Sequence, residues 1–399
     1  MKNKIVSFLA AGVIFGVASV GMAGNGNRVD VFVSFDRTPS PADAALIRAF
    51  GGRVAYSYSI TPAIAANIPE AALSGLSRNP HVTAVELDGE VYAADAELDN
   101  SWGVKRIGAG TVHDGGNKGL GIKIGIIDSG INYNHPDIDG VYAGGYDFVQ
   151  NDPDPMDVYG HGTHVAGTAC AEDNDLGVVG VAPNCALYSL RVLNNDGVGS
   201  WSATIAAMDW AVTNGMQVVN LSLGSSRNPG TAVKTAFDNA EARGIVIAAA
   251  AGNSGNAAGK GNNIIYPAKY ASVIAVGATD LTDKRASFSS TGSELEIMAP
   301  GVSVLSTWND SSSPHDPQPI CVDSVCYYKY GSGTSMASPH VAGVAALVIA
   351  KGVADDNFNG RTNDEVRQRM KETSQDLGKT GWDSQNGYGL VNAAAAVAP

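Results

Sequence analysis

Charged residues are scarce in this chain of 399 residues. They make up 16% of it, well below the roughly 25% usual for soluble domains. Basic residues are scarcer than acidic ones: the chain has 26 Lys and Arg and 39 Asp and Glu, which give a formal net charge of −13. Such a surface repels phosphate backbones and anionic lipid, so nucleic acid and membranes are not expected as partners.

Long hydrophobic runs are also missing, apart from one at the N-terminus, and this excludes a multi-span membrane protein. The chain has no triplet or heptad period, so collagen and coiled coil are excluded. It has no long polar tract either. Its 44% apolar residues can form a large core, which excludes disorder.

The N-terminal apolar run has the organisation of an export signal. Lys2 and Lys4 precede the apolar stretch Ile5–Val20, and small residues follow at Gly21–Ala23. This order predicts a signal peptide over residues 1–23 and a secreted, extracellular protein. A membrane anchor is the alternative, but Ser and Gly interrupt the stretch and a small-residue cleavage site follows it.

Residues 24–96 have the pattern of a small α+β domain. Apolar residues alternate over Val29–Phe35, as in a strand, and Ser40 is placed to cap a helix that begins at Pro41. Further strands are expected over 52–60 and 82–86, with a second helix near 69–78. The small-residue acidic segment Tyr92–Asn100 then predicts an exposed linker that a protease could cut.

Residues 97–399 have a different pattern, which predicts an α/β fold with a mostly parallel sheet and helices on both faces. Apolar strands are expected over 122–127, 187–193, 218–222 and 245–249, and helices over 202–214, 231–243 and 338–350.

Three polar positions stand out among these elements. Asp128 ends a strand, where open α/β sheets place their ligands, although an Asp-Ser-Gly turn is an equal alternative. His161 and His164 are three residues apart, but no Glu or Cys stands at metal-ligand spacing, so zinc is disfavoured. Ser335 precedes an apolar helix, where it could be a cap or a nucleophile.

The segments around Asp128, His161 and Ser335 resemble the catalytic blocks of the subtilisin-like serine proteases. The order Asp, His, Ser, with gaps of 33 and 174 residues, also matches. A fourth segment, 248–255, resembles the family's oxyanion block and contains Asn253. The resemblance extends from about Trp102 to Val397, while residues 24–96 resemble the family's inhibitory propeptide.

The resemblance implies a mechanism. His161 would take the proton of Ser335 and return it to the leaving amine, and Asp128 would orient the imidazole. The side-chain amide of Asn253 and the backbone N–H of Ser335 would hold the oxyanion. His164 would have a structural role, as would His135 and His340.

Substrate binding is expected to use the backbone of two edge segments, by strand addition. The family's pattern also places small residues on the walls of the main specificity pocket, and Ile265 stands where the family often has glycine. The residues expected to bind substrate are Gly197, Val198, Gly199, Ser222, Leu223, Gly224, Ala250, Gly252 and Ile265.

Calcium is the cofactor that the resemblance implies. The matching positions are Asp137 and the loop residues Glu172, Asn174, Leu176 and Val178. Oxygen donors on a flexible loop suit Ca²⁺, although an Asx-rich turn is the alternative. Leu98 departs from the pattern, because the family has a side-chain oxygen donor there.

The four cysteines form two close pairs. In an exported protein, an even number favours disulfides, although sequence alone does not fix connectivity. Pairs 170–185 and 321–326 are expected, formed by Cys170, Cys185, Cys321 and Cys326. Zinc is the weaker alternative, because these are not zinc spacings.

The sequence therefore predicts a secreted, calcium-dependent serine endopeptidase that is made as a self-processing zymogen and works as a monomer. Its partners would be protein or peptide substrates and its own propeptide. An inactive binding homologue is the alternative, but all four chemical positions hold competent residues. The α/β-hydrolase fold is disfavoured, because the chain shows neither its nucleophile elbow nor its Ser, Asp, His order.

Overall fold

The computed structural model describes residues 27–89, 95–309, 320–322 and 325–398, and it divides into two units, Met1–Ala94 and Asp95–Pro399. The signal peptide expected over residues 1–23 lies outside the described residues, as do residues 90–94 of the expected linker. The division falls two residues before the boundary expected from the sequence.

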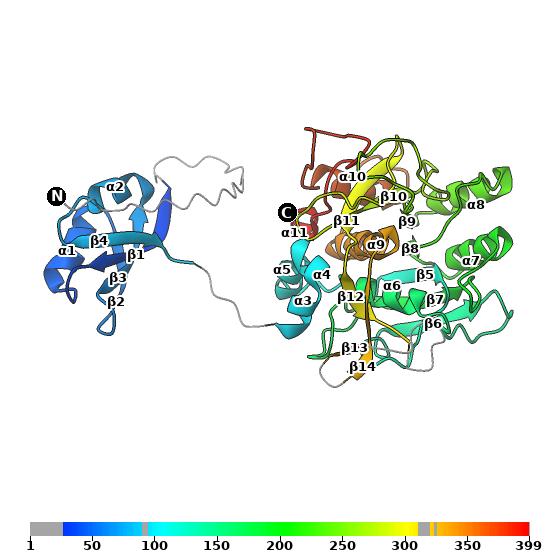
Figure 1. Ribbon diagram of the computed structural model, residues 1–399, viewed down its shortest axis with the longest axis horizontal. Helices are drawn as coiled ribbons and strands as arrows, with labels where there is room; N and C mark the ends of the chain where they lie inside the picture. Colours follow the sequence, from blue (N-terminus) through cyan, green and yellow to red (C-terminus); the bar gives the residue numbers. More distant parts are fainter. Residues whose placement is uncertain (1–26, 90–94, 310–319, 323–324, 399) are drawn as a thin grey trace. The chain divides into compact units, whose positions relative to one another are not determined.

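The first unit is an antiparallel sheet with two helices against it (Figure 1). Its strand order is β2-β3-β1-β4, and its core contains Val33, Ile47 and Ile64. The carboxylate of Asp43 accepts from the backbone N–H of Ser40 (2.8 Å) and caps the first long helix. The elements are β1 (Arg28–Phe35), α1 (Pro41–Ala49), β2 (Arg53–Ser57), β3 (Ala63–Pro69), η1 (Glu70–Ala72), α2 (Leu73–Leu76) and β4 (Val82–Leu87).

Strand β3 was not predicted from the sequence, although it pairs with both β1 and β2. Three of its seven residues are alanine, and Ile64 and Ile68 are the two β-branched ones, so its strand signal is weak. The α+β class of the unit is nevertheless as expected.

The second unit is built on a seven-stranded sheet of order β11-β10-β9-β8-β5-β7-β6, in which every neighbouring pair is parallel. The predicted α/β class is confirmed. The strands are β5 (Lys123–Asp128), β6 (Tyr142–Asp147), β7 (Ala186–Arg191), β8 (Val218–Leu221), β9 (Val246–Ala250), β10 (Ile274–Thr279) and β11 (Leu295–Pro300).

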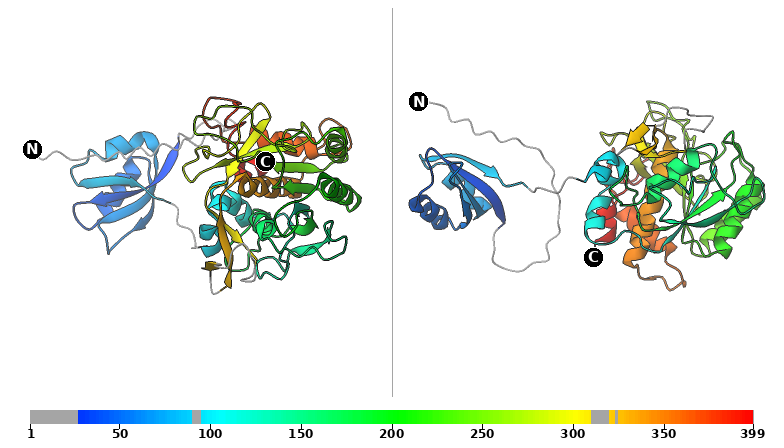
Figure 2. Two further views of the ribbon diagram at one scale, coloured as in Figure 1. Left: turned by 45° about the vertical axis from the view of Figure 1, so that its right-hand side comes forward. Right: turned by 90° about the horizontal axis from the view of Figure 1, so that it is seen from below.

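Helices cover both faces of this sheet (Figures 1 and 2). Helices α7 and α8 pack on one face around Met208 and Phe237, and α6 and α9 pack on the other around Val165 and Val344. The helices are α3 (Ala96–Asn100), α4 (Trp102–Arg106), α5 (Ala109–Asp114), α6 (His161–Cys170), α7 (Trp201–Thr213), α8 (Thr231–Glu241), α9 (Thr334–Lys351), α10 (Asn363–Glu372) and α11 (Ala393–Val397). Within the described residues, no helix combines the length and apolar character needed to cross a membrane.

Part of the expected linker is not a linker. Residues 96–100 form α3, which belongs to the second unit, and the side chain of Glu97 is only 4% exposed. Asp95 caps this helix by accepting from the backbone N–H of Leu98 (2.8 Å). The exposed-linker prediction is therefore wrong for residues 96–100, because an N-cap and a buried carboxylate fix them.

A small antiparallel sheet of order β12-β14-β13 lies in the region before Ser335. Its strands are β12 (Val304–Thr307), β13 (Ile320–Val322) and β14 (Val325–Gly331). A disulfide joins Cys321 to Cys326 in this sheet, and a second joins Cys170, the last residue of α6, to Cys185. Both predicted pairs are confirmed.

Candidate active site

The strand order brings the polar positions to one edge of the large sheet. In the sheet, β7 and β6 lie on one side of β5, and β8 and β9 lie on the other, so the strand order reverses beside β5. In open α/β sheets, ligands bind at the carboxyl ends of the strands beside such a reversal. Asp128 ends β5, and Ser222 follows β8, the strand next to β5.

Asp128 and His161 form a buried acid–imidazole pair. Their Oδ1 and Nδ1 atoms are 2.8 Å apart, and the carboxylate is fully buried. The backbone N–H of Ser129 also donates to Oδ1 (2.8 Å). Burial disfavours a charged imidazole, but the charge and hydrogen bond of Asp128 outweigh it and raise the pKa of His161. A neutral imidazole so placed can accept a proton and be stabilised as the cation.

A second carboxylate, which the sequence analysis missed, supports this pair. Asp157 is 5% exposed and accepts hydrogen bonds from Ser129 Oγ (3.0 Å) and from the backbone N–H groups of Gly160 (2.9 Å) and Thr163 (2.9 Å). It therefore joins the end of β5 to the start of α6. Its position four residues before His161 was the only signal in the sequence.

Ser335 lies in the first turn of α9, after the N-cap Gly333. Its hydroxyl donates to the carbonyl of Ser222 (3.1 Å), and the hydroxyl of Ser222 donates to the carbonyl of Ser335 (2.8 Å). Because α9 begins at Thr334 and its N-cap is Gly333, Ser335 lies inside the helix and is not its cap. The helix N-terminus favours negative charge beside this residue.

Asn253 is oriented by the neighbour of Ser335. Its Oδ1 accepts from the backbone N–H (2.9 Å) and the hydroxyl (3.0 Å) of Thr334. Only the oxygen of the amide can accept these donors, so Nδ2 is left facing away from Thr334. The structure thus brings Asn253 to the start of α9, beside Thr334.

The expected substrate segments lie beside this edge. Gly199 pairs with Leu193 in an isolated bridge, Val198 is 63% exposed, and Gly197 has a φ of 72°. A β-carbon on Gly197 would lie 2.8 Å from the ring of Tyr159, a contact that the sequence analysis missed. The residues Ser222, Leu223 and Gly224 follow β8 directly.

The expected pocket residues are in contact with one another. A β-carbon on Gly224 would come within 2.8 Å of the Ile265 side chain, and one on Gly252 would come within 3.0 Å of it. The backbone N–H of Ile265 donates to the carbonyl of Ala251 (3.0 Å), directly after Ala250 at the end of β9. Ile265 therefore fills the space between the two glycine positions.

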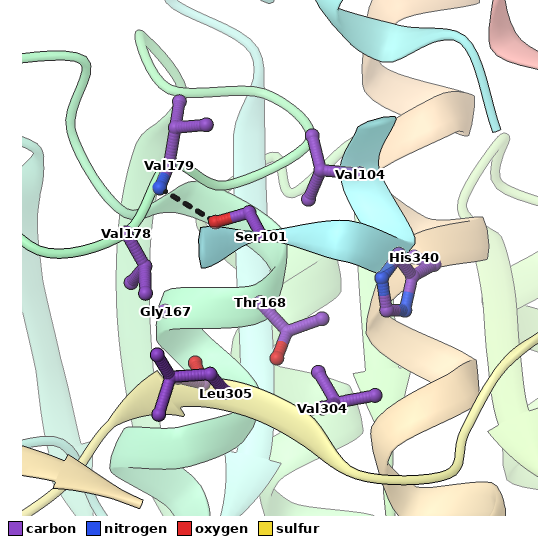
Figure 3. A pocket seen from close by; sticks show the side chains of 11 residues that line it. Ser101, Val104, Gly167, Thr168, Val178, Val179, Val304, Leu305 and His340 are labelled. Atoms are coloured by element: carbon purple, nitrogen blue, oxygen red, sulfur yellow. Dashed lines mark hydrogen bonds between the residues drawn. The ribbon is translucent and has the colours of Figure 1, made fainter. Parts of the chain in front are cut away.

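The other histidines lie outside the acid–imidazole pair. His164 Nε2 lies 3.1 Å from the carbonyl of Val304, and His135 Nε2 lies 2.8 Å from that of Tyr327. His340 Nδ1 lies 2.9 Å from the carbonyl of Met336, and its ring borders a pocket of about 10 Å³ beside Ser101 (Figure 3). These contacts fit structural roles.

The loop expected to hold calcium packs on Asp137, which is fully buried. Asp137 Oδ2 accepts from the backbone N–H of Val178 (3.1 Å) and from the hydroxyl of Tyr328 (2.9 Å), whereas Oδ1 has no hydrogen-bond partner among the described residues. Asn174 Oδ1 accepts from the backbone N–H of Leu176 (3.1 Å). Tyr328 was not foreseen, because it comes from the distant strand β14.

The side chains of Glu172 and Leu98 do not point toward the expected calcium position. The Glu172 carboxylate accepts from the backbone N–H of Gly140 (2.7 Å), so this residue can offer the loop only its carbonyl. Leu98 packs in the core, where a β-carbon on Gly110 would lie 2.4 Å from its side chain. In the part of the chain that the structure describes, no three His, Cys, Asp or Glu side chains form a metal-binding group.

A parallel α/β sheet with an acid–imidazole pair, and with a serine in the first turn of a helix at its carboxyl edge, defines the class of serine hydrolases. Residues 119–389 match the model of the subtilase family. The chain is 41% identical to subtilisin E of Bacillus subtilis (strain 168) over 369 residues, 91% of this chain and 89% of the relative. It is 47% identical to subtilisin DY of Bacillus licheniformis over 295 residues, 74% of this chain and 97% of the relative.

The chain therefore belongs to the subtilase family and is a serine endopeptidase that acts on protein or peptide substrates. An alkaline protease of Alkalihalobacillus alcalophilus is a further relative, 40% identical over 341 residues, 86% of this chain and 80% of the relative.

Proposed function

We propose that the chain is a secreted endopeptidase, made as a zymogen, that cleaves peptide bonds with Ser335 as nucleophile and His161 as base. The observation that carries this proposal is the 2.8 Å contact between His161 Nδ1 and Asp128 Oδ1. It leaves Nε2 as the imidazole nitrogen that can take the serine proton. The hydroxyl of Ser335 must first turn away from the carbonyl of Ser222.

In the proposed mechanism, attack by Ser335 forms a tetrahedral intermediate with a negative oxygen. Asn253 Nδ2 and the backbone N–H of Ser335 donate to this oxygen, and the dipole of α9 favours its charge. His161, protonated beside Asp128, then gives its proton to the leaving amine. Water attacks the acyl-enzyme by the same route.

An active-site titration tests the proposed nucleophile. A serine-directed phosphonylating reagent should inactivate the protein with one equivalent, and peptide mapping should place the label on Ser335. Labelling of another residue, with Ser335 unmodified, would contradict the assignment.

Residues 24–96 are proposed to be an inhibitory propeptide. The described part, residues 27–89, has its own core and its own sheet, separate from those of the second unit. An export spacer would need neither. Ala96, the last of these residues, lies in α3 of the second unit.

Separately made residues 24–96, added to the mature enzyme, are expected to inhibit hydrolysis of a short peptide competitively at micromolar concentration. A folded domain keeps its binding surface ordered before it binds, which lowers the cost of association. The measurement is the initial rate against propeptide and substrate concentration. Full activity with intact propeptide present would rule out an inhibitory role.

Calcium is the proposed cofactor, and the loop fits a cation. Within residues 27–89, 95–309, 320–322 and 325–398, no group donates a hydrogen bond to the buried Asp137 Oδ1, and a buried carboxylate charge is costly unless a cation compensates it. Asp137 and Asn174 would hold the ion by their side chains, with the carbonyls of Glu172, Leu176 and Val178. The bound ion would supply positive charge that fixes the loop after α6.

Chelation of calcium is expected to lower the thermal midpoint of the mature enzyme. An ion bound only by the native state stabilises it by about 2.7 kcal/mol when its free concentration is 100 times Kd. For a unit of this size, the loss corresponds to a fall of about 4 °C. Calorimetry of the phosphonylated enzyme after dialysis against chelator measures it, and an unchanged midpoint would count against a structural calcium.

A further inference from the structure

A second buried carboxylate lies against the loop that faces Asp137. Glu97, from α3, is 4% exposed, and its Oε1 accepts from the backbone N–H groups of Asn174 (3.2 Å) and Leu176 (2.8 Å). Its neighbour Leu98 points into the core instead. In α3, two side chains reach the loop: Glu97, and Asn100, whose Nδ2 donates to the carbonyl of Gly177 (2.7 Å). Of the two, only Glu97 is charged.

The surroundings of this carboxylate pair are negatively charged. The carboxylates of Glu97 and Asp137 bind neighbouring backbone N–H groups of one loop, those of Asn174 and Leu176 for Glu97 and that of Val178 for Asp137. Lys118, the cation beside the loop, is paired with Asp173 (2.5 Å).

Hydrogen bonds do not complete this site. The backbone N–H groups of Asn174, Leu176 and Val178 and the Tyr328 hydroxyl donate to the two carboxylates, yet nothing in the described part of the chain donates to the buried Asp137 Oδ1. Two anions enclosed together repel each other, whereas a divalent cation between them attracts both. The unpartnered oxygen marks where such an ion would meet the pair.

We infer that Glu97 supplies a second carboxylate to the proposed calcium site, next to the Leu98 position, where the family has a side-chain oxygen donor. This inference rests on the proposed calcium function. It predicts that the charge of Glu97 stabilises the calcium-bound protein and destabilises the calcium-free protein. The charge attracts the ion when calcium is bound, and it repels Asp137 when calcium is absent.

Glu97→Gln keeps the size of the side chain and removes its charge. The variant is expected to bind calcium at least about tenfold more weakly, since charge count sets the affinity of such sites. In chelator, its thermal midpoint should equal or exceed that of the wild type. The matched control is Asp99→Asn, which removes the same charge two residues away, where Asp99 is exposed and paired with Lys105 (2.5 Å).

The experiment uses the mature enzyme inactivated with the phosphonylating reagent, which prevents self-digestion. Thermal midpoints across a calcium titration, and terbium titrations followed by tyrosine-sensitised luminescence, report binding without activity. Weaker binding by Glu97→Gln, with Asp99→Asn unchanged and no loss of midpoint in chelator, is the expected result.

Other outcomes distinguish a failure of the inference about Glu97 from a failure of the proposed calcium site. If Glu97→Gln lowers the midpoint equally with calcium and in chelator, Glu97 is only a hydrogen-bond acceptor and the inference is overturned. If the wild type itself binds no calcium, the proposed cofactor fails first. Should Glu97→Gln not fold, Glu97→Asp retracts the charge and must still weaken binding; unchanged affinity there also overturns the inference.

Discussion

Replacement of Ser335 by alanine is expected to lower peptide hydrolysis by about 10⁶-fold, the size of loss established for the serine of subtilisin and taken from it. The reason is chemical, because His161 has no proton to accept once the hydroxyl is gone. The measurement is kcat on a short peptide, with enzyme concentration determined by absorbance.

The same variant is expected to retain residues 24–96, since self-processing needs the same nucleophile. Ser332→Ala is the matched control: Ser332 lies three residues earlier, and its hydroxyl only accepts from the backbone N–H of Ser303 (2.9 Å). Purified Ser335→Ala with a mature N-terminus near residue 97, in the absence of other proteases, would contradict self-processing.

Much of the fold could be predicted because its strands are buried on both faces. Residues of β5, β8 and β9 form near-continuous apolar runs, and their positions were predicted to within one residue at either end. Strand β3 was not predicted because alanine carries little strand signal. Helix α3 was not predicted because its short acidic sequence is typical of an exposed segment. In both cases a tertiary contact decides the structure.

The candidate site shows the same division. Asp128, His161, Ser335 and Asn253 stand in distinctive segments, so their roles could be proposed before their positions were known. Asp157, Tyr328 and Glu97 could not be found in this way. Each acts through a contact between distant segments, such as the 2.9 Å bond from Tyr328 in β14 to Asp137, and spacing along the chain does not reveal it.

Replacement of Asn253 by alanine is expected to lower kcat by roughly 10²–10³-fold, the loss established for the corresponding amide of subtilisin and taken from it. KM should change little, because the amide would meet the oxyanion in the transition state more strongly than the substrate carbonyl. Steady-state kinetics on one short peptide separate the two constants. The structure gives the cause, since Thr334 occupies the Oδ1 of Asn253 and so leaves Nδ2 as the donor.

Asn253→Asp separates this donor role from support of the loop. A carboxylate can still accept from the backbone N–H of Thr334 and from its hydroxyl, but it offers no N–H and repels an oxyanion. The aspartate variant should therefore lose at least as much kcat as the alanine variant while keeping the wild-type thermal midpoint. If it retains wild-type kcat, Asn253 only orders the start of α9, and the oxyanion must be held by other donors.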